Sequence, residues 1–267
     1  MSERTAEQRR RDSPAAHLAG LSDVGLVRAR NEDDFSIDAH AGLLIVADGV
    51  GGLPGGDVAS RVAIESLRES LGQELPDSGH PYLQYNSARD EVIGAIFAAD
   101  EAVIAAGQAD PALESMATTI VVARVVGGAA FVAHVGDVRA YKFSAGRLIQ
   151  ITHDHSLVGE MVASGKLTPE QARIHPNKNI ITQALGLGDT PMPSFSSVDL
   201  LPDDLLLLCS DGLWEAMPGA QLERIVSEAV RTDIAGAVAK CVENLADVAI
   251  EAGGNDNITL VIYRHGS

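Results

Sequence analysis

Acidic residues stand beside turns at five separate places in this 267-residue chain. The places are Glu32-Asp33, Asp48-Gly49, Asp137, Asp211-Gly212 and Asp256. Taken singly, each acid fits an ordinary role in a turn or a helix cap. Carboxylates that are crowded together repel one another and take up protons unless a cation neutralises them. Taken as a set, the five places therefore favour a divalent-metal site.

Two of the five places share a local pattern that indicates how the acids are positioned. An apolar run at residues 43–47 ends in Asp48 and Gly49, and a second run at residues 205–209 leads to Asp211 and Gly212. Continuous apolar runs of this length predict strands that are buried on both faces. We therefore expect both acids at the end of a rigid core, where glycine lets the backbone approach a ligand closely.

The composition bears on the metal and on the partners. The candidate ligands are oxygen atoms and no His/Cys pair has zinc spacing, so Mg²⁺ or Mn²⁺ is the expected ion. A net charge of −17 argues against nucleic acid and anionic membranes as partners, because the electrostatic interaction would be repulsive. Cys209 and Cys241 are expected to be buried thiols in a reducing compartment. With no apolar stretch of membrane-spanning length and no signal core, the expected location is the cytoplasm.

The order of the predicted elements indicates the fold class. Helical periodicity appears in two pairs, at 56–71 and 88–107 and again at 219–230 and 232–252. Hairpin-connected strands lie before, between and after these pairs, which argues against strict alternation of strands and helices. We expect an α+β fold, a four-layer α-β-β-α sandwich of two mainly antiparallel sheets flanked by helix pairs.

The composition along the chain also predicts how the chain divides into a tail, a domain and an insertion. Residues 1–15 are polar and charged, which is typical of a flexible tail. Residues 16–264 are expected to form a single domain. Within it, the short, polar and interrupted segment 153–188 is expected to be a lid or flap over one end of the sheet.

The sequence resembles the metal-dependent serine/threonine protein phosphatases of type 2C, in their bacterial form, from about Leu18 to Tyr263. The resemblance rests on motifs that occur in the family's order: SDVGLVRARNED at 22–33, ADGVGG at 47–52, MATT at 116–119, VGDVR at 135–139, THDHS at 152–156, ITQALG at 181–186, CSDGLWE at 209–215 and GNDNIT at 254–259. Each motif alone is weak, but all of them in order are a specific signal.

The resemblance implies that the protein hydrolyses phosphoserine and phosphothreonine on proteins. The reaction would use a hydroxide that bridges two Mn²⁺ or Mg²⁺ ions, with a weaker third ion nearby. By resemblance, Asp48 bridges the two metals and the Gly49 carbonyl completes the second site. Asp211 and Asp256 would hold the first metal.

The resemblance also implies roles for the remaining site residues. Asp33, with Glu32, would act at the second metal, and Asp137 together with Asp211 would hold the third ion. Arg28 would clamp the substrate phosphate, for which its planar fork is suited. Asn257 would orient the site from behind the ligands.

One position departs from the family. A histidine usually follows the Asp-Gly-x-Gly-Gly motif, and this chain has Leu53 there. A candidate proton donor for the leaving group is therefore absent. His134, His153 and His155 are near in sequence, but we expect structural roles for them.

Two other functions fit parts of the pattern. One is an inactive phosphatase-like module that binds phosphoproteins or metal, and the other is an interaction protein whose acidic loops keep it in solution. No metal carboxylate of the family pattern is missing, which favours the active enzyme. The expected partners are phosphorylated protein substrates of a bacterial serine/threonine kinase, and the expected state is a monomer.

Overall fold

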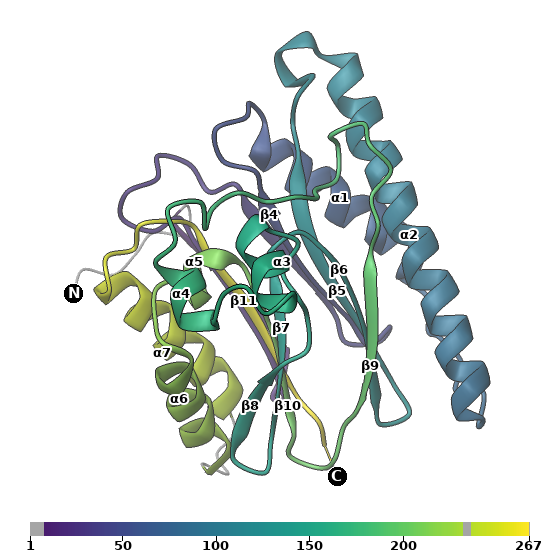
Figure 1. Cartoon of the computed structure of the whole chain (residues 1–267). Coiled ribbons are helices and arrows are strands. Elements are labelled where there is room, and N and C mark those ends of the chain that lie inside the picture. Colours follow the sequence, from purple (N-terminus) through teal and green to yellow (C-terminus); the bar gives the residue numbers. More distant parts are fainter. Residues whose placement is uncertain (1–7, 232–235, 267) are drawn as a thin grey trace.

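Two antiparallel sheets form the centre of the molecule (Figure 1). The computed structural model describes residues 8–231 and 236–266. The six-stranded sheet has the order β1 (Arg9–Ala15), β2 (Leu18–Asp23), β11 (Ile258–Arg264), β10 (Leu205–Cys209), β7 (Arg139–Ser144) and β8 (Arg147–Gln150). The five-stranded sheet has the order β3 (Asp33–Asp38), β4 (Leu43–Gly49), β5 (Thr118–Val126), β6 (Ala129–Val135) and β9 (Ser194–Asp199).

Helix pairs cover the outer faces of both sheets. Helices α1 (Gly56–Leu71) and α2 (Pro81–Ala109), with the short 3₁₀ turn η1 (Pro111–Leu113), lie on the five-stranded sheet. Helices α6 (Gly219–Arg231) and α7 (Ala237–Glu251) lie on the six-stranded sheet. The expected four-layer α-β-β-α sandwich is therefore confirmed.

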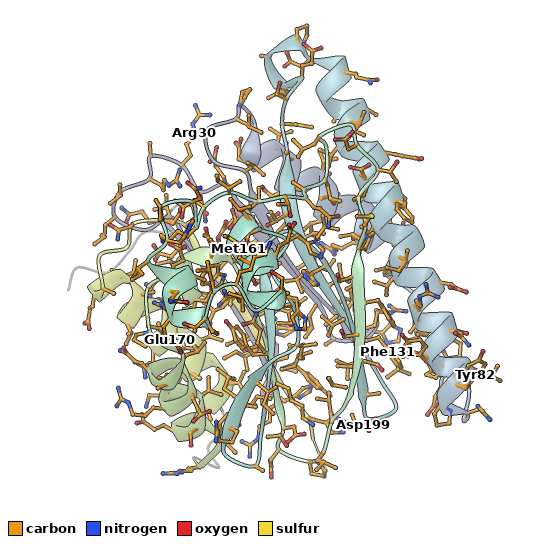
Figure 2. All side chains as sticks on the ribbon, in the orientation of Figure 1. Arg30, Tyr82, Phe131, Met161, Glu170 and Asp199 are labelled. Atoms are coloured by element: carbon orange, nitrogen blue, oxygen red, sulfur yellow. The ribbon has the colours of Figure 1, made fainter. Side chains whose placement is uncertain are left out.

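The central strands are apolar on both faces because each face packs on a different layer. In β4, Leu43 and Ile45 belong to the core under α1 and α2, whereas Leu44 and Val46 face the other sheet. Alternation along a strand sends successive side chains to opposite faces, so both layers need apolar residues here. Side chains fill the space between the layers (Figure 2).

The N-terminal segment corrects the predicted tail. Residues 9–15 form β1, which pairs antiparallel with β2, while residues 1–7 lie outside the described residues. Arg9 donates to Asp23 at 2.6 Å and to Asp247 at 2.7 Å. The charged run looked like a tail because these acidic partners are distant in sequence.

Helix α2 differs from its prediction in two ways. It begins at Pro81 rather than at residue 88, because proline at the first helical position costs no hydrogen bond. It is also long and apolar enough to cross a membrane by length and composition, since an 18-residue window within it has a mean hydropathy of 1.4, against the expectation that no stretch has that length. Its buried residues, such as Val92 and Ile96, join the core shared with α1 and β4. That packing is typical of a core helix.

The segment 153–188 contains two short helices, α3 (Leu157–Ala163) and α4 (Pro169–Arg173), and lies against α5 (Asp211–Trp214). A capping box at Thr168 starts α4. Arg173 donates to the Trp214 carbonyl at 3.3 Å, and Lys178 pairs with Glu215. The segment is therefore anchored beside the element that begins with Asp211, and its role as a lid stays a prediction.

Candidate metal centre

Strand register places two of the predicted acids opposite each other. Asp33 on β3 pairs with Asp48 on β4, and Gly49 pairs with Thr118 on β5. Directly opposed residues in an antiparallel pair have Cα atoms about 4.5–5.5 Å apart. Asp33 and Asp48 are thus brought together by the sheet itself.

The other predicted acids arrive at the same end from different elements. Asp211 is the first residue of α5 and follows β10, whereas Asp256 precedes β11, the neighbour of β10. Asp137 lies in the turn between β6 and β7. Asp137, Asp211 and Asp256 all act electrostatically on Asp48. The structure therefore gathers the carboxylates that the sequence analysis singled out.

The acids lie in surroundings that oppose negative charge. Asp33 and Asp137 are buried, while Asp48 and Asp211 are only half-buried and keep accessible surface. Burial raises the pKa of Asp33 to about 6 and the pKa of Asp137 to about 7. Loss of solvent and then the charge of neighbouring acids raise the pKa of Asp48 and the pKa of Asp211 well above the usual range. A divalent cation would neutralise this cluster, so the all-oxygen donor set fits a hard metal.

The side chains need a small rearrangement to bind an ion. Within the described residues, no three His, Cys, Asp or Glu side chains are grouped closely enough to hold a metal. Two of the acids have other partners, because Ser210 Oγ donates to Asp33 at 2.7 Å and Arg28 Nη2 donates to Asp256 at 2.7 Å. Ligation requires the Asp256 carboxylate to turn from Arg28 and the Asp33 carboxylate to turn in part from Ser210, each toward its own ion.

Two glycines are required by close backbone approach. A Cβ on Gly49 would lie 2.5 Å from the Gly56 carbonyl oxygen and 2.7 Å from that of Glu32. A Cβ on Gly212 would lie 1.9 Å from the Asn257 carbonyl oxygen. Any side chain at these positions would push apart the loops that carry the acids.

Backbone contacts hold the loop around Glu32. The Gly49 N–H donates to the Glu32 carbonyl at 3.1 Å. Asn257 accepts from the Glu32 N–H at 2.8 Å and donates to the carbonyls of Val24 and Arg30 at 2.9 and 3.0 Å. Burial raises the pKa of Glu32, whose side chain lies beside Gly56. These contacts agree with an orienting role for Asn257, which remains a prediction.

Three side chains form a supporting group behind Asp137, and the contacts that join them were not predicted. Trp214 Nε1 donates to the Asp137 carbonyl at 3.2 Å, and the Arg139 guanidinium lies 3.5 Å from the Trp214 ring centroid. Arg139 also makes a bidentate pair with Asp154, at 2.9 and 2.6 Å. In the sequence, the motif VGDVR places Arg139 two residues after Asp137. Asp154 comes from the segment 153–188.

Two of the three nearby histidines, His134 and His155, have structural contacts, whereas the side chain of His153 is exposed. The rings of His134 and His155 stack at 4.5 Å, and each bonds a neighbouring group, the His153 carbonyl at 2.8 Å and Ser194 Oγ at 2.9 Å. Burial lowers the pKa of His134 to about 4, so its ring is neutral at pH 7. Leu53 lies in the turn after β4, where its N–H donates to the Val50 carbonyl at 3.4 Å.

A second unpredicted residue connects α2 to the site. Asp100 accepts a hydrogen bond from the Gly186 N–H at 2.8 Å. The preceding Leu185 exchanges backbone hydrogen bonds with Thr118 at 3.1 and 2.9 Å. Thr118 Oγ1 in turn donates to the Asp48 carbonyl at 2.9 Å. The only signal in the sequence was an acidic residue among the apolar residues of a predicted helix.

Comparison with known proteins identifies the family. The protein phosphatase 2C family profile matches residues 27–248. Protein phosphatase PhpP of Streptococcus pneumoniae is 36% identical over 245 residues, covering 91% of this chain and 94% of that protein.

Solved structures agree with the sequence match. The serine/threonine phosphatase PstP/Ppp of Mycobacterium tuberculosis superposes with a TM-score of 0.79 at 32% identity, covering 94% of this chain and 98% of that one. The PstP catalytic domain in complex with two manganese ions gives a TM-score of 0.78 at 31% identity, with the same coverage of 94% and 98%. On the sequence match, the shared fold and the shared order of motifs, this chain belongs to the protein phosphatase 2C family.

Proposed function

We propose that this protein hydrolyses phosphoserine and phosphothreonine esters on proteins with the help of two Mn²⁺ or Mg²⁺ ions. The observation that carries the proposal is the convergence of the predicted acids at one end of the two sheets. The relatives named as phosphatases and the manganese complex of PstP support it. Nothing in the comparisons favours the inactive phosphatase-like module.

The acids divide into ligand groups. Asp48 and the Gly49 carbonyl would serve the second ion together with Asp33, and Asp48 would also serve the first ion with Asp211 and Asp256. Asp137 with Asp211 would hold a weaker third ion. Two divalent cations about 3.5–4 Å apart lower the pKa of bound water and stabilise charge developing at phosphorus.

Arg28 is placed to hold the substrate phosphate. Its guanidinium is partly exposed beside Gly51, where a Cβ would lie only 3.1 Å from Nη1. It pairs with Asp256 in this structure, and a cation on Asp256 would release it. A free guanidinium fork could then donate two parallel hydrogen bonds to phosphate oxygens.

Phosphate release from a phosphothreonine peptide tests the function. We expect hydrolysis with Mn²⁺, none with a chelator, and a loss of at least about a hundredfold in Asp211→Asn, since even residues behind metal ligands cost 10–100-fold. Asp34→Asn is the matched control, because Asp34 pairs with the exposed side chain of Arg10 and is not one of the predicted ligands. Metal-dependent peptide binding without phosphate release would instead indicate the inactive module.

The finer assignments are also proposals. We propose a monomer in the cytoplasm that acts on proteins phosphorylated by a bacterial serine/threonine kinase. Light scattering of the purified protein tests the monomer. Phosphoproteomics of cells that carry Asp48→Asn tests the substrates, and an unchanged phosphoproteome would contradict them.

A further inference from the structure

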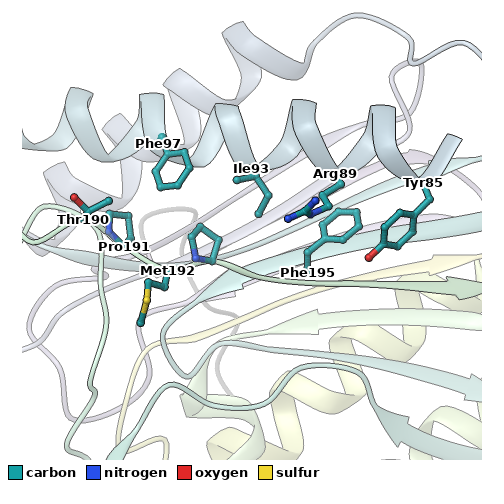
Figure 3. Close-up of a pocket in the computed structure, with 9 residues that line it drawn as sticks. Tyr85, Arg89, Ile93, Phe97, Thr190, Pro191, Met192 and Phe195 are labelled. Carbon is teal, nitrogen blue, oxygen red and sulfur yellow. The ribbon is translucent and has the colours of Figure 1, made fainter. Parts of the chain in front are cut away.

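A groove of about 520 Å³ lies between α2 and the segment that leads into β9 (Figure 3). One wall is a stripe on α2 with a residue every fourth position: Tyr85, Arg89, Ile93 and Phe97. Such residues share one face of a helix. The other wall is formed by Thr190, Pro191, Met192, Pro193 and Phe195. None of these residues belongs to the carboxylate cluster.

The groove combines exposed apolar groups with a fixed wall. Met192 is 72% exposed and Phe97 is 38% exposed. Phe195 is held in place by an edge-to-face contact with Tyr85 at 5.3 Å and a stacked contact with Phe131 at 6.4 Å. Exposed apolar side chains gathered in a preformed hollow mark a binding surface more strongly than the same groups scattered singly. Tyr82, at the start of α2, lies beyond the groove and projects away from the sheets (Figure 2).

Arg89 gives the groove a charge preference. In the described part of the chain, its guanidinium has neither a hydrogen-bond nor an ion-pair partner. The chain carries 37 acidic and 20 basic residues, so this cation lies on a molecule that is acidic overall. An occupant with a carboxylate or another anionic group would complement it.

The adjoining strand offers backbone groups to an extended chain. β9 is at the edge of its sheet, and among the described strands it pairs with β6 alone. An edge strand presents unpaired N–H and C=O groups, which extended peptides use for recognition. β9 begins at Ser194, so the groove wall runs into the strand, with Phe195 as its second residue. An extended segment therefore finds backbone partners and side-chain contacts in one place.

The groove also lies at a distance from the carboxylates that one extended peptide can span. Ser194 pairs with His134 near the end of β6, three residues before Asp137. In the sheet order, β9 is three strands from β4, which carries Asp48. Three spacings of about 4.8 Å give about 14 Å, which an extended chain covers in four or five residues at about 3.4 Å each.

We propose that this groove binds an extended segment of the phosphoprotein substrate. Apolar side chains of the segment contact Phe97, Ile93 and Met192, and an acidic side chain pairs with Arg89. The anchor stands about five residues from the phosphorylated residue. This inference rests on the proposed phosphatase function and adds a determinant of substrate choice to it.

Kinetics with matched peptides test the groove. Phosphothreonine peptides would carry a Phe-Asp anchor about five residues before or after the phosphothreonine, or Ser-Ser in its place. We expect an anchored peptide to have a KM about tenfold lower than its Ser-Ser counterpart. Arg89→Glu should remove that advantage without changing kcat or the hydrolysis of a small aryl phosphate. Arg68→Glu on α1 makes the same charge change outside the groove and should keep the advantage.

Direct binding separates this inference from the phosphatase function. Fluorescence anisotropy with an unphosphorylated anchored peptide needs no turnover, and Arg89→Glu should weaken its binding about tenfold. An absence of aryl phosphate hydrolysis together with intact, Arg89-dependent peptide binding would overturn the function and support the groove. Equal KM values for anchored and Ser-Ser peptides would overturn the proposal that the groove binds the substrate. A dimer in light scattering that Arg89→Glu abolishes, with no peptide binding, would assign the groove to a second copy and overturn the inference.

Discussion

Asp48 is held on both sides by the sheet that carries it. It pairs with Asp33 on β3 and with Thr119 on β5, and its carbonyl accepts from Thr118. An apolar run followed by Asp-Gly was enough to predict its position from sequence. The Arg28–Asp256 ion pair was not predictable in this way, because its partners are 228 residues apart. Local patterns therefore indicated where the candidate acids lie, and tertiary contacts decide which partner each of them has.

Substitution of Arg28 tests its proposed contact with the substrate phosphate. Arg28→Ala should lower kcat/KM for a phosphothreonine peptide about tenfold or more, because it removes a bidentate phosphate ligand. Arg28→Lys should recover part of that loss, since the charge is kept and the fork is not. Steady-state kinetics on both variants measure the effect. Unchanged kcat/KM in Arg28→Ala would show that another group holds the phosphate.

Elements with a periodic apolar pattern were predictable, and the element without such a pattern was not. The buried strands β4 and β10 and the amphipathic helix α1 have periodic patterns that indicate their type. β1 has no such pattern, because five of its seven residues are exposed and its stability comes from β2 and from Asp247 on α7. The strand β1 was therefore missed because Arg9 pairs with Asp247, which lies at the other end of the chain.

Arg9 tests the role of β1. Its partner Asp23 is fully buried, and its own side chain is 6% exposed. Breaking a buried ion pair costs about 3–5 kcal/mol, so Arg9→Ala should lower the free energy of unfolding by about 3 kcal/mol. Arg11→Ala, which removes an exposed pair with Glu243, should cost less than about 1 kcal/mol. Urea denaturation compares the two, and equal losses would contradict the inference that β1 is an integral strand.

Asp100 tests the connection from α2 to Asp48. Asp100→Ala leaves the Gly186 N–H without its acceptor, and we expect kcat to fall about tenfold as the Thr118 strand end loses support. Asp100→Asn keeps a carbonyl oxygen as acceptor and should restore most of the rate. Kinetics at saturating Mn²⁺, with melting temperatures measured alongside, separate positioning from global stability. A normal kcat in Asp100→Ala would show that this connection has no part in catalysis.

At the scale of the whole molecule, the fold gathers negative charge in a chain that is already strongly acidic. The net charge is −17, and the site adds carboxylates at the junction of two sheets. The layer order followed from sequence patterns, and the residues of the candidate site were proposed from those patterns and from the resemblance to the family. The path of the segment 153–188 and the groove beside β9 could not be predicted, because both depend on how loops pack against the folded sheets and helices.

The protonation of the site should make stability depend on metal and pH together. The pKa of Asp33 is raised to about 6 and that of Asp137 to about 7, so the folded protein binds more protons than the unfolded chain between about pH 4 and 7. The stability that these groups contribute is present below about pH 4 and is lost as the pH rises through about 6 to 7. At higher pH, bound Mn²⁺ should stabilise the folded protein instead, because the metal competes with protons for the same carboxylates.

Thermal unfolding with and without Mn²⁺ measures this linkage. We expect the manganese-induced rise in melting temperature to be larger at about pH 8 than at about pH 5, since ligand binding to the folded state stabilises it. Asp34→Asn should show the same pattern as the unchanged protein. An equal rise at both pH values would mean that these carboxyl groups are not the ligands.

Asp48 is proposed to be shared by two metal ions, and calorimetric titration with Mn²⁺ counts the ions that depend on it. The unchanged protein and Asp34→Asn should each bind two ions tightly, whereas Asp48→Asn should lose both tight sites at once. Loss of a single site would show that Asp48 serves one ion only. Two tight sites in Asp48→Asn would contradict the account.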